Sequence, residues 1–244
     1  MLCNMLTKRS LLLYTTALLS SIFFAFTIYQ EKDNTLTPAE QKAGWVLLFN
    51  GKDTSGWRSY NHKSYNSWEA VNGQLHCKTK DQNVQQRADL ITLHQYDNFE
   101  IQFDWKVEKG ANSGVMYHVL ETSGSSYETG PEYQLIDEDG YAQKLEATQK
   151  SGADYAMHAP LSSAARPTGE YNRSRIIVKD AHVEHWLNGK IVADFDLWTR
   201  QWQQLKENGK WKNAKDYGMA KKGYIALQDH GGGVWFKNIK LRKF

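Results

Sequence analysis

The residues best suited to acid–base chemistry lie in a short polar stretch near the middle of the 244-residue chain. A Gly-Pro turn signal precedes Glu132, and a segment of strand-like composition follows it. Because the side chains of a strand alternate between its two faces, Glu132 and Gln134 project from the same face. The sequence therefore predicts a surface that presents a carboxyl group beside an amide. A solvated strand face would show the same pattern, so a second signal is needed.

A second polar stretch, near the C-terminus, supplies that signal. From Tyr224 onward, alternation places Gln228 and His230 on one face, directly before three consecutive glycines. Two strands with paired polar residues, one with an acid and one with an imidazole, suggest a cleft. His118 lies in a third strand-like segment, where alternation groups it with Met116, and it is a weaker candidate for the same cleft.

A long segment with little periodicity, residues 142–172, follows the first polar stretch. Irregular segments of this length inside a compact domain are usually functional loops. We expect it to form a lid or rim over the groove, with Tyr155 and its neighbours Asp154 and His158 as contributors.

The elements that position these residues are predicted to be strands. Residues 99–108 alternate strictly between apolar and polar side chains, and Asn72-Gly73 and Asn188-Gly189 are strong hairpin signals. With little helical periodicity elsewhere, the pattern predicts a single all-β domain, a sandwich of the jelly-roll type. The nine Trp and thirteen Tyr suit both a sandwich core and a wet groove that binds sugars.

The N-terminal residues are predicted to direct export. Residues 1–29 combine Lys8 and Arg9 with a long uncharged run, which indicates a signal peptide or an uncleaved membrane anchor. We therefore expect a periplasmic protein, or one anchored in the membrane and facing the periplasm. A polar lead-in, residues 30–43, includes a short helix opened by Thr37-Pro38, and the folded domain is predicted over residues 44–244.

Charge and cysteine content exclude several classes of protein. Beyond residue 29 the chain holds 28 Lys or Arg and 27 Asp or Glu, so it offers no basic stripe for nucleic acid. Cys3 lies in the leader, which leaves Cys77 alone in the domain. An internal disulfide and a zinc–cysteine cluster are both excluded there. The sequence contains no signal of oligomeric state.

Five blocks in order give the chain a family resemblance. They are residues 48–57 (LFNGKDTSGW), 111–118 (ANSGVMYH), 129–137 (TGPEYQLID), 185–189 (HWLNG) and 223–231 (GYIALQDHG). Together they resemble the 3-keto-disaccharide hydrolase domain family, over roughly residues 44–244. The resemblance implies a concanavalin A-like jelly roll whose concave sheet holds sugar, in an exported bacterial protein that acts on glycosides oxidised at the third sugar carbon.

For such a substrate the resemblance implies a specific chemistry. A ketone at C3 acidifies the C2 proton, so a base can remove it and the enolate can expel the C1 oxygen. We expect Glu132 and His230 to be the acid–base pair and Gln134 and Gln228 to bind hydroxyl groups. Asp137 or Arg175 would orient the site. A divalent cation could serve as the electrophile, although no residue spacing demands a metal.

Two alternatives remain open at this stage. The first is conventional glycoside hydrolysis by two carboxylates, for which Glu128 and Glu132 are candidates. The second is a carbohydrate-binding module without catalytic activity, in which aromatic side chains stack on sugar rings.

Overall fold

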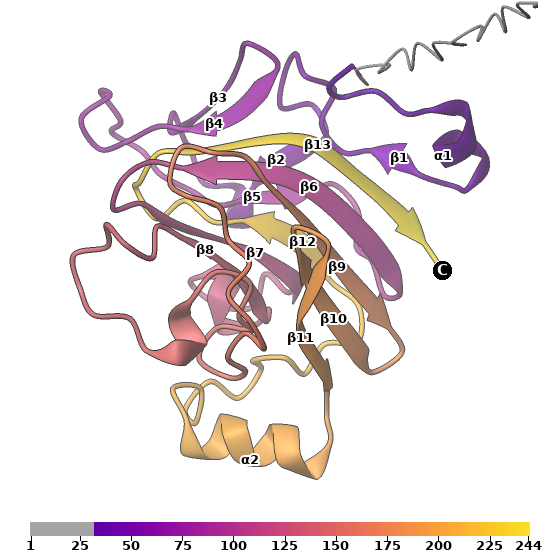
Figure 1. Cartoon of the computed structure of the whole chain (residues 1–244), viewed down its shortest axis with the longest axis vertical. Helices are drawn as coiled ribbons and strands as arrows, with labels where there is room; N and C mark the ends of the chain where they lie inside the picture. The colour runs from indigo at the N-terminus through magenta and orange to yellow at the C-terminus, as the bar shows by residue number, and fades with distance from the viewer. Residues whose placement is uncertain (1–31) are drawn as a thin grey trace, which may run out of the picture. The chain divides into compact units, whose positions relative to one another are not determined.

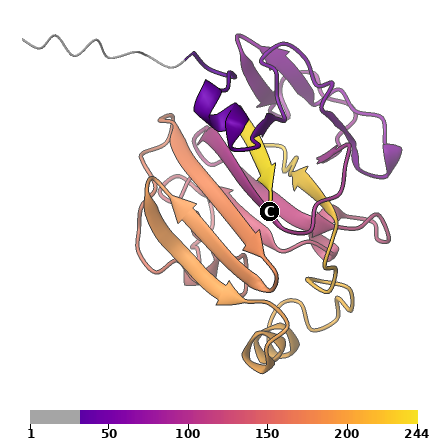
Figure 2. The same cartoon turned by 90° about the vertical axis from the view of Figure 1, so that its right-hand side faces the viewer.

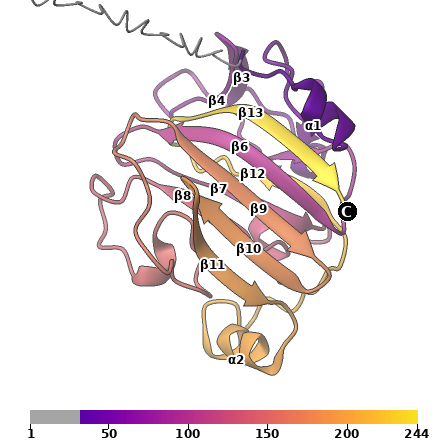
Figure 3. The same cartoon turned by 45° about the vertical axis from the view of Figure 1, so that its right-hand side comes forward.

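The computed structural model describes residues 32–244, so the predicted leader, residues 1–29, lies outside the described residues. In the described part, two antiparallel sheets pack face to face (Figures 1 and 3). The predicted all-β sandwich of the jelly-roll type is therefore confirmed. Among the helices of residues 32–244, none is long and apolar enough to cross a membrane.

The two sheets differ in size and are named here by their strand number. The eight-stranded sheet runs β11 (Lys190–Asp196), β10 (His182–Leu187), β9 (Asn172–Lys179), β6 (Phe99–Val107), β13 (Val234–Lys243), β4 (Gln74–Cys77) and β3 (Trp68–Val71), with β1 (Val46–Leu47) beside β13. The five-stranded sheet runs β2 (Trp57–Ser59), β5 (Leu90–Thr92), β12 (Tyr224–Leu227), β7 (Asn112–Val119) and β8 (Glu132–Ile136).

Short helices and turns complete the fold. They are α1 (Pro38–Lys42), α2 (Arg200–Asn208) and the 3-10 turns η1 (Tyr60–His62), η2 (Ser126–Glu128) and η3 (Ala147–Gln149). The predicted lead-in helix is α1, and Thr37 caps it through a reciprocal capping box with Glu40. Figure 2 shows α2, in gold, at one end of the sandwich, after the orange strands β10 and β11.

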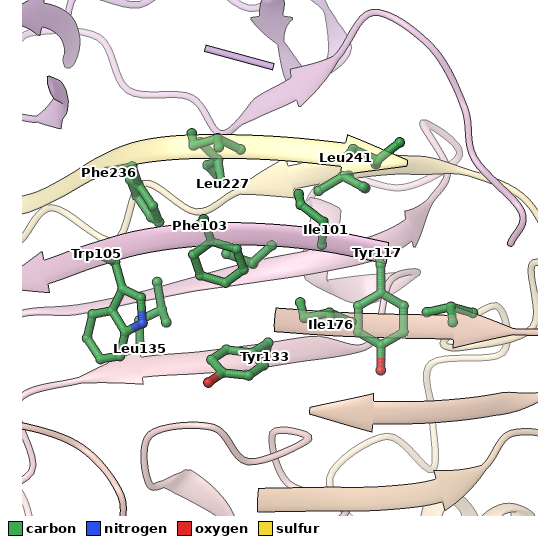
Figure 4. Close-up of a cluster of buried hydrophobic side chains, with 14 of the residues drawn as sticks. Ile101, Phe103, Trp105, Tyr117, Tyr133, Leu135, Ile176, Leu227, Phe236 and Leu241 are labelled. Carbon is green, nitrogen blue, oxygen red and sulfur yellow. The ribbon is translucent and has the colours of Figure 1, made fainter. Parts of the chain in front are cut away.

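The core fills the space between the sheets with large apolar side chains (Figure 4). Phe103 of β6 contacts Phe236 of β13 at 6.3 Å between ring centroids, and it meets Tyr133 of β8 edge-on at 5.8 Å. These rings are almost fully buried, and each contributes roughly 1.5–3 kcal/mol by leaving water. The apolar face of β6, predicted from its alternation, therefore packs against the five-stranded sheet.

The two predicted hairpins are present, and each uses the backbone geometry that Asn-Gly favours. Asn72 and Gly73 connect β3 to β4 with φ of 50° and 74°, and Asn188 and Gly189 connect β10 to β11 with φ of 48° and 82°. Positive φ at both central residues matches the right-handed twist of the flanking strands. The sequence therefore specified both turns locally.

The long segment between β8 and β9 lies along the edge of the sandwich. Its Ala153 carbonyl accepts from the Gln134 N–H at 3.1 Å, and the Tyr155 N–H donates to the Glu132 carbonyl at 2.9 Å. Farther on, the Leu161 N–H donates to the Val192 carbonyl of β11 at 2.7 Å. Because β8 is an edge strand, its free backbone groups need partners, and this segment provides them.

Candidate active site

Polar side chains gather on the outer face of the five-stranded sheet, which is the face turned away from the core. Gly114 of β7 pairs with Gln134 of β8, and the Gly114 carbonyl accepts from the Gln228 N–H at 2.9 Å. The register of β12 against β5 places Asp89 opposite Gln228. One row across the sheet therefore presents the carboxyl of Asp89, the amide of Gln228, a gap at Gly114 and the amide of Gln134.

Glu132 occupies the gap that Gly114 leaves. A Cβ on Gly114 would lie 2.1 Å from the Glu132 Oε1 and 2.7 Å from its Cγ and Cδ. Glu132 can lie this close to β7 only because Gly114 has no side chain, since contacts this short do not occur between real atoms. On the adjacent row, Ala226 of β12 pairs with Met116 of β7, and Met116 pairs with Glu132. Met116 and Ala226 are buried and give Glu132 an apolar environment on this side.

Burial changes the acidity of Glu132. Its side chain is 4% exposed, and this desolvation raises the pKa of the carboxyl to about 8. The Lys210 ammonium opposes the rise, while the nearby carboxyls of Asp89 and Asp154 add to it. At neutral pH Glu132 is therefore mainly protonated and can donate a proton.

The two amides on either side of the gap have polar atoms without a partner. The Oε1 atoms of Gln134 and Gln228 are buried and accept no hydrogen bond from any residue in the described range. Buried polar atoms are nearly always paired. A ligand with hydroxyl groups would donate hydrogen bonds to both atoms. The prediction that these amides bind hydroxyl groups therefore has a structural basis.

His230 lies just past β12, beside the same row. The preceding residue, Asp229, is held by the Arg87 guanidinium at 2.6 Å and by the Gly231 N–H at 3.1 Å. Partial burial lowers the pKa of His230, and the positive charges of Lys80 and Lys210 act in the same direction. The imidazole is therefore neutral at pH 7 and can accept a proton.

A pocket of about 190 Å³ opens above this part of the sheet. Asp89, Gln228 and His230 line it from the sheet side, and Lys63, directly after η1, and Tyr127 of η2 line it from the opposite side. Glu132 lies in the adjacent row and interacts electrostatically with Asp89. The structure thus brings Glu132, Gln134, Gln228 and His230 to one side of the molecule, where Gln228 and His230 line the pocket and Glu132 and Gln134 lie beside it. Their pairing as acid and base stays a prediction.

Two residues of this site were not predicted from the sequence. Asp89 lines the pocket, accepts hydrogen bonds from the Ser126 hydroxyl and from the Asp229 N–H, and has its pKa raised by burial. Its position one residue before β5, in alternation with Ile91, was the available signal. Lys210 follows α2 in a segment without periodicity, so no sequence signal pointed to it.

Lys210 is held beside Glu132 by aromatic side chains. Its Nζ lies 4.2 Å from the ring centre of Tyr155 and 4.8 Å from that of Trp211. These are cation–π contacts, in which the face of an aromatic ring attracts a positive charge. The Trp211 indole N–H donates to the Tyr155 carbonyl at 3.1 Å. Tyr155, predicted as a contributor, therefore belongs to this surround.

His118 does not share the pocket face with Met116, and that prediction is wrong. A register shift between β12 and β7 interrupts the alternation, and His118 takes a φ of 54°. Its ring is buried, bonds the Asp97 carbonyl at 2.8 Å and packs edge-on against Phe99. A β-bulge of this kind re-aims a side chain without any sign in the alternation pattern.

Asp137 and Arg175 lie away from Glu132, so the expectation that they orient this site is corrected. Asp137 ends β8 and accepts from the Gly110 N–H at 2.7 Å and from the Thr168 hydroxyl. It borders a different pocket, of about 170 Å³. Arg175 lies on the outer face of the eight-stranded sheet, with its guanidinium 4.0 Å from the ring centre of Trp186.

A metal site is not preformed in the part of the chain described. Residues 32–244 contain no group of three or more His, Cys, Asp and Glu side chains arranged to hold an ion. The pocket offers Asp89 and His230 as oxygen and nitrogen donors, and a divalent cation there would need further ligands from substrate or water.

Known proteins resemble this chain over most of its length. A 3-keto-disaccharide hydrolase of Bacteroides thetaiotaomicron is 32% identical over 87% of this chain and 82% of its own length. A solved structure from Parabacteroides distasonis, described as an inferred glycosyl hydrolase, has a TM-score of 0.81 and 40% identity over 87% of this chain and all of its own. A second protein so described from that organism has a TM-score of 0.63 and 25% identity, over 82% of this chain and 99% of its own.

The Parabacteroides distasonis structure with a TM-score of 0.81 agrees with a concanavalin A-like jelly roll. Residues 44–242 also match the profile of one protein family, and this range includes every residue of the site described above. The chain belongs to the family of the 3-keto-alpha-glucoside-1,2-lyase-like domain.

Proposed function

We propose that this protein is a carbohydrate-active enzyme that cleaves the glycosidic bond of glycosides oxidised at C3. The observation that carries the proposal is a carboxyl and an imidazole on one side of the molecule whose pKa values are shifted in opposite directions by burial. Burial keeps Glu132 protonated at neutral pH, while His230 is held neutral. Titratable groups whose pKa values are pushed in this way are typical of acid and base partners in catalysis. The family membership supports the same substrate class.

The proposed reaction is an elimination followed by addition of water. The base takes the C2 proton, and the electron pair of the C2–H bond forms an enolate with the C3 carbonyl. When the carbonyl re-forms, a C1=C2 double bond appears, and the bond from C1 to the glycosidic oxygen breaks. A proton then passes to the leaving oxygen. Water adds across the double bond, with its hydroxyl on C1 and a proton on C2.

The geometry suggests which residue performs each step. His230 is neutral and open to the pocket, so we assign it the removal of the C2 proton. Glu132 is protonated and is assigned proton donation to the leaving oxygen. The Lys210 ammonium interacts with both residues and would stabilise the enolate oxygen, since a cation aimed at developing negative charge lowers the barrier.

A second candidate is conventional hydrolysis by two carboxylates, and one observation favours it. Asp89 and Glu132 face the same part of the outer surface, and each carries a pKa raised by burial. Paired acids of this kind cleave glycosides without prior oxidation of the sugar. Here Asp89, rather than the predicted Glu128, is the partner of Glu132.

A comparison of substrates separates these reactions. The protein is incubated with a 3-keto disaccharide and with the parent disaccharide, each with and without a chelator, and the products are analysed. We expect cleavage of the 3-keto compound and none of the parent. Cleavage of both at similar rates would favour the two-carboxylate reaction, and binding without cleavage of either would indicate a carbohydrate-binding module.

The pH profile tests the assignment of acid and base. Activity should rise with pH as His230 loses its proton below its ordinary pKa of 6.5, and should fall as Glu132 loses its proton around pH 8. We therefore expect a bell-shaped kcat/KM profile. In His230→Asn the acid limb should disappear, and in Glu132→Gln the alkaline limb should disappear. Loss of the opposite limb in either variant would reverse the assignment.

We also propose that the enzyme acts outside the cytoplasm, in the periplasm or on a membrane facing it. The support is the basic and then apolar composition of residues 1–29. Fractionation of expressing cells, with N-terminal sequencing of the purified protein, would decide between a cleaved leader and an anchor.

A further inference from the structure

Positive charge is concentrated on one side of the proposed active site. Residues 32–244 carry 28 Lys or Arg and 26 Asp or Glu, whereas residues 200–222 hold seven of the former and two of the latter. This basic segment packs along the start of β8, where the Gly218 N–H donates to the Thr129 carbonyl at 2.8 Å. An almost neutral molecule therefore presents a local excess of cations beside the pocket.

Three exposed lysines from three separate segments lie at this pocket or close to His230, which lines it. Lys63 follows η1 and lines it directly. Lys80 lies in the loop between β4 and β5, and its side chain passes along Gly231, where an added Cβ would be 2.7 Å from the Lys80 Cε. Lys210 approaches from the basic segment. Scattered surface lysines are usually solvated, but here Lys63 lines the pocket of about 190 Å³. Lys80 and Lys210 both interact electrostatically with His230, which lines the same pocket.

Acidic side chains interact with two of these lysines, Asp89 with Lys63 and Glu132 with Lys210, but only through space. In the described range none of the three forms an ion pair. Lys63 donates instead to the Gly124 carbonyl at 3.0 Å. The acids of the pocket are already engaged, because Asp229 pairs with Arg87 at 2.6 Å and Asp89 accepts from the Ser126 hydroxyl.

We infer that the substrate carries an anionic group, a carboxylate, sulfate or phosphate, which binds to Lys63 and Lys80 at the mouth of the pocket. The inference rests on the proposed function, because it places the reacting carbons beside His230 and Glu132 and the charged group farther out. Complementary charge of this kind selects among substrates and speeds their capture. The ring of Tyr127, 38% exposed at the pocket, offers an apolar face between the two regions.

The anionic group could belong to the aglycone or to C6 of the oxidised sugar, and three substrates distinguish these sources. The reference is the 4-(carbamoylmethyl)phenyl 3-keto-glucoside, which is neutral. The second compound replaces the amide by a carboxylate, giving the 4-(carboxymethyl)phenyl 3-keto-glucoside. The third keeps the neutral aglycone on a 3-keto-glucuronide. We expect at least one anionic compound to exceed the reference by about tenfold in kcat/KM at low salt.

Variants connect this preference to the lysines. In Lys63→Gln/Lys80→Gln the ratio of the anionic to the neutral kcat/KM should fall from about ten to below three. In the matched control Lys212→Gln/Lys215→Gln, which removes two exposed charges from the basic segment outside the pocket lining, the ratio should stay within twofold of the wild type. Added salt should lower the wild-type ratio, because it screens exposed charges.

The outcomes separate this inference from the proposed reaction. Equal kcat/KM for all three compounds in the wild type, or a ratio unchanged in Lys63→Gln/Lys80→Gln, would overturn the anionic site and leave the reaction standing. Calorimetry on Glu132→Gln measures binding independently of turnover. If the wild type cleaves none of the compounds, tighter binding of an anionic one, lost on removal of Lys63 and Lys80, would support the site and refute the reaction. Equal binding would refute both.

Discussion

Replacing Glu132 by Gln should reduce kcat on a 3-keto glycoside by about 10³-fold while the protein stays folded. The amide keeps the size of the carboxyl group in the gap above Gly114 but cannot give a proton to the leaving oxygen. General acid catalysis contributes about 10²–10⁴-fold. Steady-state kinetics with the purified variant measure the effect, and the thermal unfolding midpoint reports on the fold.

The raised pKa of Glu132 also predicts whether Glu132→Gln stabilises or destabilises the folded protein. The folded-state pKa of about 8 lies above the ordinary value of 4.5, so the folded protein binds the extra proton. The contribution of Glu132 to stability is therefore present below pH 4.5 and is lost as the pH rises toward 8. Glu132→Gln should unfold at an equal or higher temperature than the wild type at pH 8.

A matched control places the same substitution on the other sheet. Glu69 of β3 is partly exposed and pairs with His76 at 3.1 Å, on the eight-stranded sheet. Glu69→Gln should keep kcat within twofold of the wild type. A Glu132→Gln variant with wild-type kcat would remove this residue from the mechanism.

Replacing Gly114 by Ala should be almost as damaging as losing Glu132 itself. The added Cβ would meet the Glu132 Oε1 at 2.1 Å, so the carboxyl must leave its position. Displacement of a catalytic group by about 1 Å can cost about 10²-fold in rate, and a larger shift should bring the loss near 10³-fold. The measurement is kcat, with the unfolding midpoint recorded in parallel.

Gly124→Ala is the control for the glycine substitution. Its added Cβ would have its nearest neighbour, the Glu128 Oε2, at 4.0 Å, and the backbone there is compatible with alanine. Gly124 also borders the pocket, but its added Cβ displaces no catalytic group, so we expect little change in kcat. If Gly114→Ala retained full activity, the catalytic position of Glu132 would not be the one described here.

The sequence predicted the features of the fold that depend on neighbouring residues. The alternation of residues 99–108 gave β6, and Asn72-Gly73 gave a hairpin because both positions accept positive φ. The shared face of Glu132 and Gln134 also follows from a local period of two. Each of these predictions needs only a few consecutive residues.

The rest of the site depends on contacts between distant segments. The position of β12 between β5 and β7 cannot be predicted from periodicity. This strand order brings Gln228 and Asp89 to the row of Gly114. Lys210 is positioned by aromatic contacts in an irregular loop. His118 was misplaced because a bulge breaks the period of β7. Tertiary register, rather than residue type, decided all of these positions.

The removal of the C2 proton is the step that distinguishes the proposed reaction from conventional hydrolysis, and a label at that carbon tests it directly. A 3-keto glycoside with deuterium at C2 is compared with the unlabelled compound in water, and an enzyme-free sample corrects for spontaneous exchange. We predict slower enzymatic cleavage of the labelled compound and loss of its deuterium to solvent during turnover. Equal rates, with deuterium kept at C2 in the product, would contradict the mechanism.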